Sequence, residues 1–368
     1  MAGALRVKVP DRMKEDLMER SDTPPIRLAV LGAGGLGKAA ARIIGMKREV
    51  RLCAVCDSRG VVLSPEGVDT GAIASLAGDL VSGYRQATEA ARDADGGGVG
   101  VATRCEMRSC DDPVGALLER AEHFDAILIT LPNLPNEFIP QVTERVLSAH
   151  PSLVLVDVLK RTRAVEQMLA LDALAKRSRS VVLTGCGATP GILAAAAVLA
   201  AQSFIEVEKV DLWWGVGIAN WETYKATIRE DIAHLPGYSV ERARAMSDAE
   251  IEALLEQTHG LLELRHMEHA DDLLLQRAGV VDHLDQVEVG GVMDTRHANK
   301  PVSTTMTLTG TTFDGKRSSH RFILGDETTM AANVVGPALG YLKRGVWLKA
   351  HGLFGVFGCT EFLPMVVR

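Results

Sequence analysis

Three glycines with the spacing Gly-x-Gly-x-x-Gly point most directly to chemistry: Gly32, Gly34 and Gly37. They follow a short apolar run, 26–31, and precede a helix-favouring stretch, 38–46. In such a turn the first glycine permits a tight bend, the second lets the backbone approach a pyrophosphate, and the third lets helix and strand pack closely. The helix N-terminus then faces the phosphate charge. The pattern predicts a dinucleotide site, and a glycine turn kept only for packing is the alternative.

An acidic residue follows the next predicted strand, 50–56, as the dinucleotide motif requires. Asp57 would accept hydrogen bonds from a ribose and favours NAD, whereas Arg59 would hold a 2′-phosphate and favours NADP. We favour NAD over NADP and treat Arg59 as a solvated loop residue. The residues predicted to bind the cofactor in these two segments are Gly32, Ala33, Gly34, Gly35, Leu36, Gly37, Asp57, Ser58 and Arg59.

The loop 132–136 follows a third apolar strand, 125–131. Open α/β sheets bind ligands at the carboxyl ends of their strands, so we expect this loop to border the nicotinamide ribose. An ordinary proline-stiffened loop is the alternative. The predicted cofactor contacts here, with one from a later glycine-rich turn, are Leu131, Pro132, Asn133 and Gly187.

Asp157 and Lys160 lie at the end of the next predicted strand, 153–158, on the same side of the sheet. A partly desolvated lysine can act as an acid or base, or orient a substrate carbonyl. We therefore predict Lys160 and Asp157 as catalytic residues. Arg161 and Arg163 make a solvated basic run the alternative.

A second glycine-rich turn, 185–191, precedes the apolar stretch 192–201. Its glycines and proline suggest backbone brought close to a ligand, so we predict that Cys186 and Pro190 face the substrate. A plain strand-to-helix turn is the alternative, and a nucleophilic role for the Cys186 thiol is disfavoured.

Polar side chains in the C-terminal half are candidates for holding substrate carboxylates, because arginine offers a bidentate fork and lysine a point charge. These candidates are Tyr224, Arg229, His234, Arg296, His297 and Lys300. The four predicted to bind substrate are Tyr224, Arg229, Arg296 and Lys300.

No metal site is predicted. Two clusters have metal-ligand residue types and are assigned otherwise: His266, His269, Asp271 and Asp272 to the solvated face of a charged helix, and Cys53, Cys56, Cys105 and Cys110 to core packing. Residues three apart in a strand point to opposite faces, so Cys53 and Cys56 are unsuited to share one metal ion.

The alternation of strands and helices predicts an α/β fold with a Rossmann, doubly wound parallel sheet. A second α+β domain with a mixed or antiparallel sheet follows, interrupted by a helical segment over 248–275. The predicted divisions are an extension at 1–25 with a short helix over 11–20, a dinucleotide-binding domain at 26–185 completed by 328–368, and a substrate domain at 186–327. Within the first domain, 58–110 is expected to leave the sheet, with a helix over 70–91 and a flexible glycine run at 96–98.

Composition favours a small-molecule partner. A net charge of -7, with cations scattered along the 368 residues, argues against nucleic acid and anionic membrane as partners. The longest apolar stretch, 192–201, is about half the ~20 residues a membrane span needs and reads as a buried helix. Dispersed cysteines and an N-terminus without a signal-peptide pattern lead us to expect the cytoplasm.

The chain resembles the saccharopine dehydrogenase-like oxidoreductases through Leu31–Gly37, Gly185–Gly191 and the predicted final helix, 328–344. The resemblance implies a Rossmann domain completed by C-terminal segments and a substrate domain that forms a homodimer. It also implies hydride transfer between NAD(P) and the amine or imine carbon of a small amino-acid-like substrate.

Two alternatives to this function stay open from the sequence. The segments 57–60 and 64–69 are similar to the residues that follow the second strand of homoserine dehydrogenase, which would imply oxidation of an amino-acid alcohol. A chain that binds NAD(P) as a sensor or scaffold without catalysis is the second alternative, since each predicted acid or base also has a structural explanation.

Overall fold

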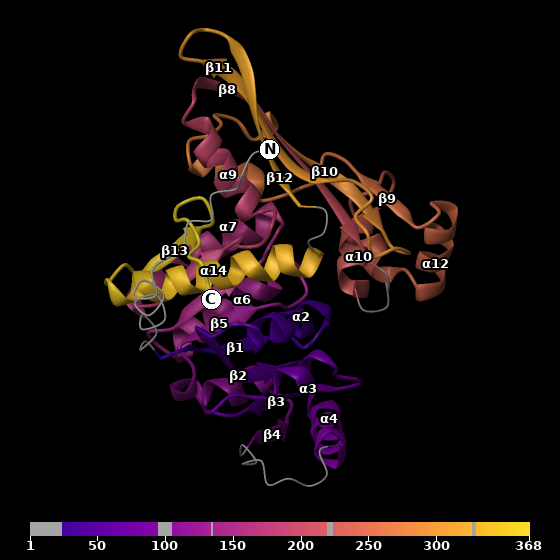
Figure 1. Ribbon diagram of the computed structural model, residues 1–368, viewed down its shortest axis with the longest axis vertical. Helices are drawn as coiled ribbons and strands as arrows, with labels where there is room; N and C mark the ends of the chain where they lie inside the picture. The colour runs from indigo at the N-terminus through magenta and orange to yellow at the C-terminus, as the bar shows by residue number, and fades with distance from the viewer. Residues whose placement is uncertain (1–23, 95–104, 134, 219–223, 326–328) are drawn as a thin grey trace, which may run out of the picture.

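Two β-sheets organise the chain and lie in different halves of the molecule (Figure 1). The computed structural model describes residues 24–94, 105–133, 135–218, 224–325 and 329–368. The predicted helix over 11–20 and the glycine run at 96–98 lie outside them. Within the described part of the chain, no helix is long and apolar enough to cross a membrane.

The first sheet has eight strands in the order β13-β7-β6-β5-β1-β2-β3-β4. Their bounds are β1 Ile26–Leu31, β2 Val50–Cys56, β3 Gly60–Leu63, β4 Glu106–Ser109, β5 Ala126–Ile129, β6 Val154–Asp157, β7 Val181–Thr184 and β13 Gly355–Gly358. Neighbouring strands from β13 to β2 are parallel. The predicted Rossmann-type parallel sheet is confirmed.

Apolar runs explain why these strands form the centre of the first unit. All four residues of β5, of β6 and of β7 are buried. Because successive side chains of a strand point to opposite faces, such strands must be covered on both faces. The flanking helices are α2 Gly35–Ile44, α3 Thr70–Ala74, α4 Leu80–Ala94, α5 Pro113–Leu118, α6 Phe138–Ala149, α7 Thr162–Ala170, α8 Asp172–Arg177 and α14 Met330–Ala350.

The segment after Asp57 extends the sheet, contrary to the predicted excursion. Strands β3 and β4 add to its edge in antiparallel order. The single helix predicted over 70–91 is two helices, α3 and α4, because Gly78 adopts a positive φ of 74° between them. The Asp69 side chain caps α3 by accepting from the amide of Ala72.

The C-terminal segment returns to the first sheet. Helix α14 packs on β5, β6, β7 and α2, and β13 pairs in parallel with β7 (Figure 1). Pro337 lies inside α14 without ending it. Residues 162–177 form two helices, α7 and α8, with Leu171 between them. The predicted domain boundaries stay a prediction.

The second sheet has five strands in the order β12-β11-β8-β10-β9. Their bounds are β8 Phe204–Gly217, β9 Leu261–Leu264, β10 Val287–Asp294, β11 Thr304–Thr312 and β12 Arg317–Leu324. Strands β8 and β10 are parallel and the other pairs antiparallel, so the sheet is mixed. The helices of this half are α9 Ile192–Ala201, α10 Lys225–Ile232, α11 Val240–Ala245, α12 Asp248–Gln257 and α13 Asp271–Arg277.

The helical segment predicted over 248–275 is wrong in its middle. Strand β9 separates α12 from α13 and pairs with β10. Its alternating exposed and buried residues over 261–264 are too few to stand out within a helical pattern. Helices α9 and α13 pack on each other and on the second sheet: α9 contacts β8 and β11, and α13 contacts β10. Helix α13 also contacts α7 of the first half.

Candidate active site

Lys160 is the centre of a buried ionic cluster at the carboxyl end of β6. Its Nζ lies 2.6 Å from Asp231 Oδ1 and 3.4 Å from Glu230 Oε2. The two carboxylates come from α10, in the other half of the molecule. The side chain of Lys160 is 18% exposed, whereas those of Glu230 and Asp231 are 3% and 2% exposed. Among these three residues, Lys160 is the one that solvent reaches.

The two carboxylates set the charge of Lys160. Burial alone would lower the pKa of Lys160, but the charges of Asp231 and Glu230 outweigh burial and raise it, so the side chain is an ammonium. Burial raises the pKa of Asp231 above its ordinary value, although Lys160 opposes this. Asp231 is therefore easier to protonate than an exposed aspartate and lies at hydrogen-bond distance from a proton donor.

Asn133 connects the loop after β5 to the same cluster. Its Nδ2 donates to Glu230 Oε2 at 3.0 Å. The carboxyl ends of β5 and β6 thus both reach α10, through Asn133 and Lys160. The other two predicted cofactor contacts of this loop, Leu131 and Pro132, are half-buried and exposed.

Arg161 is buried beside the cluster and not part of a solvated basic run. Its Nε donates to Asn136 Oδ1 at 2.9 Å, and Nη2 donates to Glu268 Oε2 at 2.6 Å. Its Nη1 lies 3.2 Å from His234 Nε2. Burial, with Arg161 and Lys160, lowers the pKa of His234 to about 3, so the ring is neutral and Nε2 accepts from the guanidinium.

His269 and Asp271 form a second buried pair, which corrects their prediction as a solvated face. His269 Nδ1 lies 2.7 Å from Asp271 Oδ2, with side chains 2% and 0% exposed. Thr189 of the glycine-rich turn donates to the same carboxylate at 2.6 Å. The amide of Ala270 donates to the carbonyl of Lys160 at 2.7 Å, so this segment also holds the Lys160 backbone. In the described part of the chain, no three His, Cys, Asp or Glu side chains are arranged to hold a metal ion.

Asp157 is fully buried and joins the loops after β6 and β7. Its Oδ1 accepts at 3.0 Å from the amides of Leu159 and Gly185 and from Thr184 Oγ1. Burial raises the pKa of Asp157 to about 6. It therefore positions the Lys160 loop and has no exposed atom with which to meet a substrate.

The turn after β7 is enclosed. Cys186 is fully buried, its Sγ lies 3.5 Å from the carbonyl of Thr184, and burial raises the pKa of its thiol well above the ordinary value. Gly187 and Pro190 are also buried, and the Thr189–Pro190 peptide bond is cis. A Cβ at Gly191 would lie 1.8 Å from the carbonyl oxygen of Gly187, so close packing explains the glycine at position 191.

The first glycine turn has the geometry that its spacing predicts. Gly32 has a φ of 113°, and a Cβ at Gly37 would lie 1.8 Å from the Gly32 carbonyl oxygen. Gly34 precedes α2, and a Cβ there would meet nothing within 4 Å. Thr130 Oγ1 donates to the carbonyls of Leu31 and Gly32 and fixes the turn to the end of β5. The remaining residues of the predicted motif, Ala33, Gly35 and Leu36, are half-buried.

Asp57, which was predicted to contact a ribose, makes local structural contacts. Its Oδ1 accepts from the amides of Arg59 and Gly60 at 2.8 and 3.0 Å, and its Oδ2 accepts from the amide of Leu80 at 3.2 Å. Both oxygens thus serve the β2–β3 turn and the start of α4. Ser58 and Arg59 are exposed on this turn.

The substrate-binding residues predicted in the second half make contacts within the chain. Arg229 donates to the carbonyls of Ala243 and Met246 and pairs with Asp248, so it ties α10 to α11 and α12. Arg296 pairs with Glu256 at 3.0 Å. Tyr224 is half-buried and directly precedes α10. His297 Nδ1 lies 2.8 Å from Asp294 Oδ2, and Lys300 donates to the carbonyl of Gly325.

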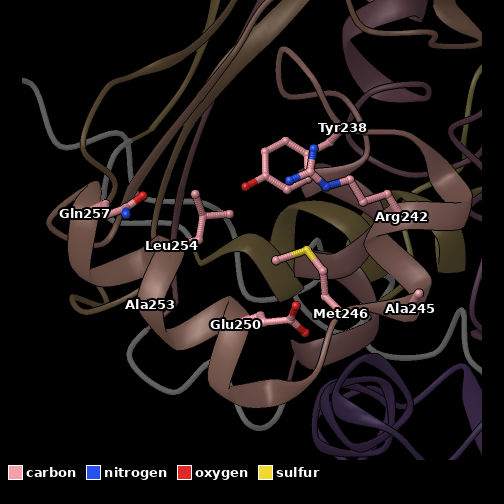
Figure 2. Close-up of a pocket in the computed structure, with 8 residues that line it drawn as sticks. All are labelled: Tyr238, Arg242, Ala245, Met246, Glu250, Ala253, Leu254 and Gln257. Atoms are coloured by element: carbon pink, nitrogen blue, oxygen red, sulfur yellow. The ribbon is translucent and has the colours of Figure 1, made fainter.

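A hollow of about 350 Å³ lies between α11 and α12 (Figure 2). Figure 2 shows the Arg242 guanidinium beside the ring of Tyr238. The guanidinium carbon lies 4.4 Å from the centroid of that ring. The lining residues are Tyr238, Arg242, Ala245, Met246, Glu250, Ala253, Leu254 and Gln257. Lys160 and its carboxylates do not line this hollow, which is therefore separate from the cluster.

A curated protein of Haloferax mediterranei decides the family. It is named (S)-8-amino-7-oxononanoate synthase BioU and is 44% identical over 349 residues, which are 92% of this chain and 99% of that protein. The chain belongs to the BioU family. It is accordingly an enzyme, and a small molecule is its substrate. No family model matches the chain.

Solved structures share the fold of this BioU-family chain at low identity. An engineered D-amino acid dehydrogenase bound to NADP+ has a TM-score of 0.52 at 15% identity, over 94% of each chain. The DAP dehydrogenase of C. glutamicum in complex with DAP has a TM-score of 0.52 at 15% identity, over 94% of this chain and 95% of that one. Saccharopine dehydrogenase of Saccharomyces cerevisiae has a TM-score of 0.51 at 10% identity, over 91% and 94%. At these identities the likeness concerns the fold alone.

Membership of the BioU family corrects the functional predictions. The relative is named a synthase, so the assignments to the saccharopine dehydrogenase-like oxidoreductases and to hydride transfer at an amine or imine carbon are wrong, as are the two alternatives. The cofactor prediction of NAD or NADP, made from the glycine motif and Asp57, is corrected as well, because the relative is named a synthase and not a dehydrogenase. The physical source of the error is that the glycine turn and the parallel sheet report the fold, which many functions share.

Several residues of the cluster escaped sequence reasoning. Glu230 and Asp231 lie in the charged run 229–231, which reads as the solvated face of a helix. No sequence pattern indicated Glu268 as a site residue. The one available indication was the predicted position of Lys160 at the end of a buried strand, because an ammonium there requires carboxylates from elsewhere in the fold.

Proposed function

We propose that this chain has the activity for which its relative is named, the synthesis of (S)-8-amino-7-oxononanoate, and that the Lys160 cluster is its active site. The 44% identity over 92% of this chain and 99% of the relative carries the proposal. The position of Lys160 at the carboxyl end of β6 supports the choice of site, since open α/β sheets bind ligands at that edge.

The functional groups of (S)-8-amino-7-oxononanoate match the cluster. The molecule carries a ketone next to a carbon that bears an amine. The Lys160 ammonium donates to the ketone oxygen and stabilises negative charge that develops there. Asp231, 2.6 Å from Nζ, takes up or returns a proton as Lys160 changes its charge. Lys160 is the proposed catalytic residue and Asp157 a positioning residue.

Conversion of the amino ketone by the purified chain tests this function. We would add the chain to a cell extract with and without added (S)-8-amino-7-oxononanoate and quantify that compound by chiral chromatography and mass spectrometry. Since an enzyme accelerates both directions of its reaction, formation or consumption that depends on the chain supports the proposal. An unchanged amount in every extract would overturn it.

Two variants of Lys160 test the site. Lys160→Met removes the ammonium, and we expect conversion to fall by about a hundredfold or more. It also leaves Glu230 and Asp231 without their cation, at a cost of about 3–5 kcal/mol in the free energy of unfolding. Lys160→Arg is the matched control, because it keeps the positive charge but cannot release a proton. Folded Lys160→Arg with wild-type conversion would contradict the catalytic role.

We also propose that the chain forms a homodimer through the second sheet. Strand β12 is an edge strand, and large apolar side chains are exposed on it and near it: Ile205, Phe313, Phe322 and Ile323. Light scattering of the purified chain measures its mass, and a monomer at all concentrations would contradict the proposal.

A further inference from the structure

The acids of the cluster around Lys160 outnumber its lysine and arginine side chains. Asp231 pairs with Lys160 at 2.6 Å, Glu268 with Arg161 at 2.6 Å, and Asp271 faces His269 at 2.7 Å. Glu230 is the remaining acid of the cluster, and its nearest cation, Lys160 Nζ, is 3.4 Å away and already bound to Asp231. The ring of His234 supplies no charge, because it is neutral.

Glu230 also has an oxygen without a partner. Its side chain is 3% exposed, and Oε2 accepts from Asn133, whereas Oε1 has no hydrogen-bond partner among the described residues. A buried carboxylate with an unused oxygen is costly unless a cation or donor reaches it. The described residues form no metal-holding group, so an organic cation is the occupant that the chemistry favours.

We infer that Glu230 binds the ammonium group of the substrate and so selects α-amino ketones over simple ketones. This inference rests on the proposed function. In an α-amino ketone the ketone oxygen and the amine nitrogen are on adjacent carbons, about 3 Å apart. Lys160 Nζ lies 3.4 Å from the Glu230 carboxylate, measured at Oε2, so a ketone oxygen held by Lys160 brings the ammonium beside this carboxylate, whose Oε1 has no partner. Lys160 is more accessible than Glu230 and Asp231, so it is the group of these three that can turn to the ketone.

Binding of two matched ligands tests the inference. Calorimetric titration compares (S)-8-amino-7-oxononanoate with 7-oxononanoate, which lacks the amine and is otherwise the same. We expect the wild type to bind the amino ketone about tenfold more tightly or better, as a charge-assisted hydrogen bond provides. Glu230→Gln keeps the size of the side chain and an acceptor for Asn133. It should weaken binding of the amino ketone about tenfold and leave that of 7-oxononanoate unchanged.

The outcomes separate this inference from the proposed function. If the wild type converts (S)-8-amino-7-oxononanoate but binds both ligands equally, or if Glu230→Gln weakens both equally, the role of Glu230 is overturned and the function stands. If the wild type neither converts nor binds either ligand, both are overturned. Asp248→Asn is the control: this exposed partner of Arg229 also anchors α10, and its loss should leave the preference for the amine intact.

Discussion

Lys160 and Asp157 show what a residue's position in the sequence can and cannot tell. Asp157 ends the buried strand β6 and Lys160 follows it, at the edge of the parallel sheet where ligands bind. The sequence therefore predicted both as catalytic. Only the fold separates them, because Asp157 turns inward to three donors while Lys160 reaches α10. The partners that define their roles come from distant parts of the chain, such as Thr184 and Asp231.

Asp157 should make the stability of the chain depend on pH. Its pKa in the folded chain, about 6, is above the ordinary value of 3.8, so the folded state binds the proton more tightly. The stability that this group contributes is complete at pH below 3.8 and is lost as the pH rises through about 6. At about 1.4 kcal/mol per pH unit, the loss is about 3 kcal/mol.

Asp157→Asn resembles the protonated side chain and should remove this loss. Urea denaturation of the wild type and variant at a series of pH values measures the free energies of unfolding. Relative to the variant, the wild type should lose about 3 kcal/mol between about pH 4 and pH 7. Parallel curves for the two proteins would show that Asp157 does not titrate in this range.

At the scale of elements, close packing explains only part of the glycine turn between β1 and α2, and the sequence did not show which part. The Gly37 position is closed by the Gly32 carbonyl, whereas Gly34 faces open space. Asp57, the acid that completed the predicted motif, caps its own turn. The spacing of the glycines therefore predicted the geometry of the backbone turn correctly and the bound cofactor incorrectly.

Two alanine variants distinguish these glycines. Gly37→Ala places a Cβ 1.8 Å from a backbone oxygen and should lower the free energy of unfolding by about 3 kcal/mol or more. Gly34→Ala meets nothing within 4 Å and should change it by no more than about 1 kcal/mol. Thermal unfolding followed by circular dichroism measures both. Equal destabilisation of the two variants would mean that the turn can shift to accept the methyl group.

Elements with a strong local pattern were predictable, and those that depend on distant partners were not. Four strands of the first sheet, β1, β2, β5 and β6, are apolar runs between turns, and their predicted positions agree with the structure to within two residues at each end. Strand β9 has only four residues and owes its form to pairing with β10. Helix α10 was not predicted to belong to the site, because its acids are paired with Lys160, and Lys160 and Asp231 are 71 residues apart in the sequence.

At the scale of the whole molecule, the C-terminal segment completes the half of the protein that begins the chain. Helix α14 covers β5, β6 and β7, and Leu339, Tyr341, Leu342 and Leu348 of α14 are fully buried. Burial of each such side chain contributes about 2 kcal/mol. Together they contribute about as much as the net stability of a typical domain.

A chain ending at Gly325 should therefore fail to fold. It lacks α14 and β13, so one face and one edge of the first sheet are uncovered, and the Lys160 cluster at that sheet's carboxyl end loses its support. Limited proteolysis should show rapid digestion within residues 26–185, which contain the rest of the first sheet. A chain ending at Leu363 is the control, since it keeps both elements and loses mainly the contacts of the last residues with Gly340 and Glu49. A cooperative unfolding transition for the chain ending at Gly325 would show that the first sheet is stable without its C-terminal cover, and that α14 contributes much less than its buried area indicates.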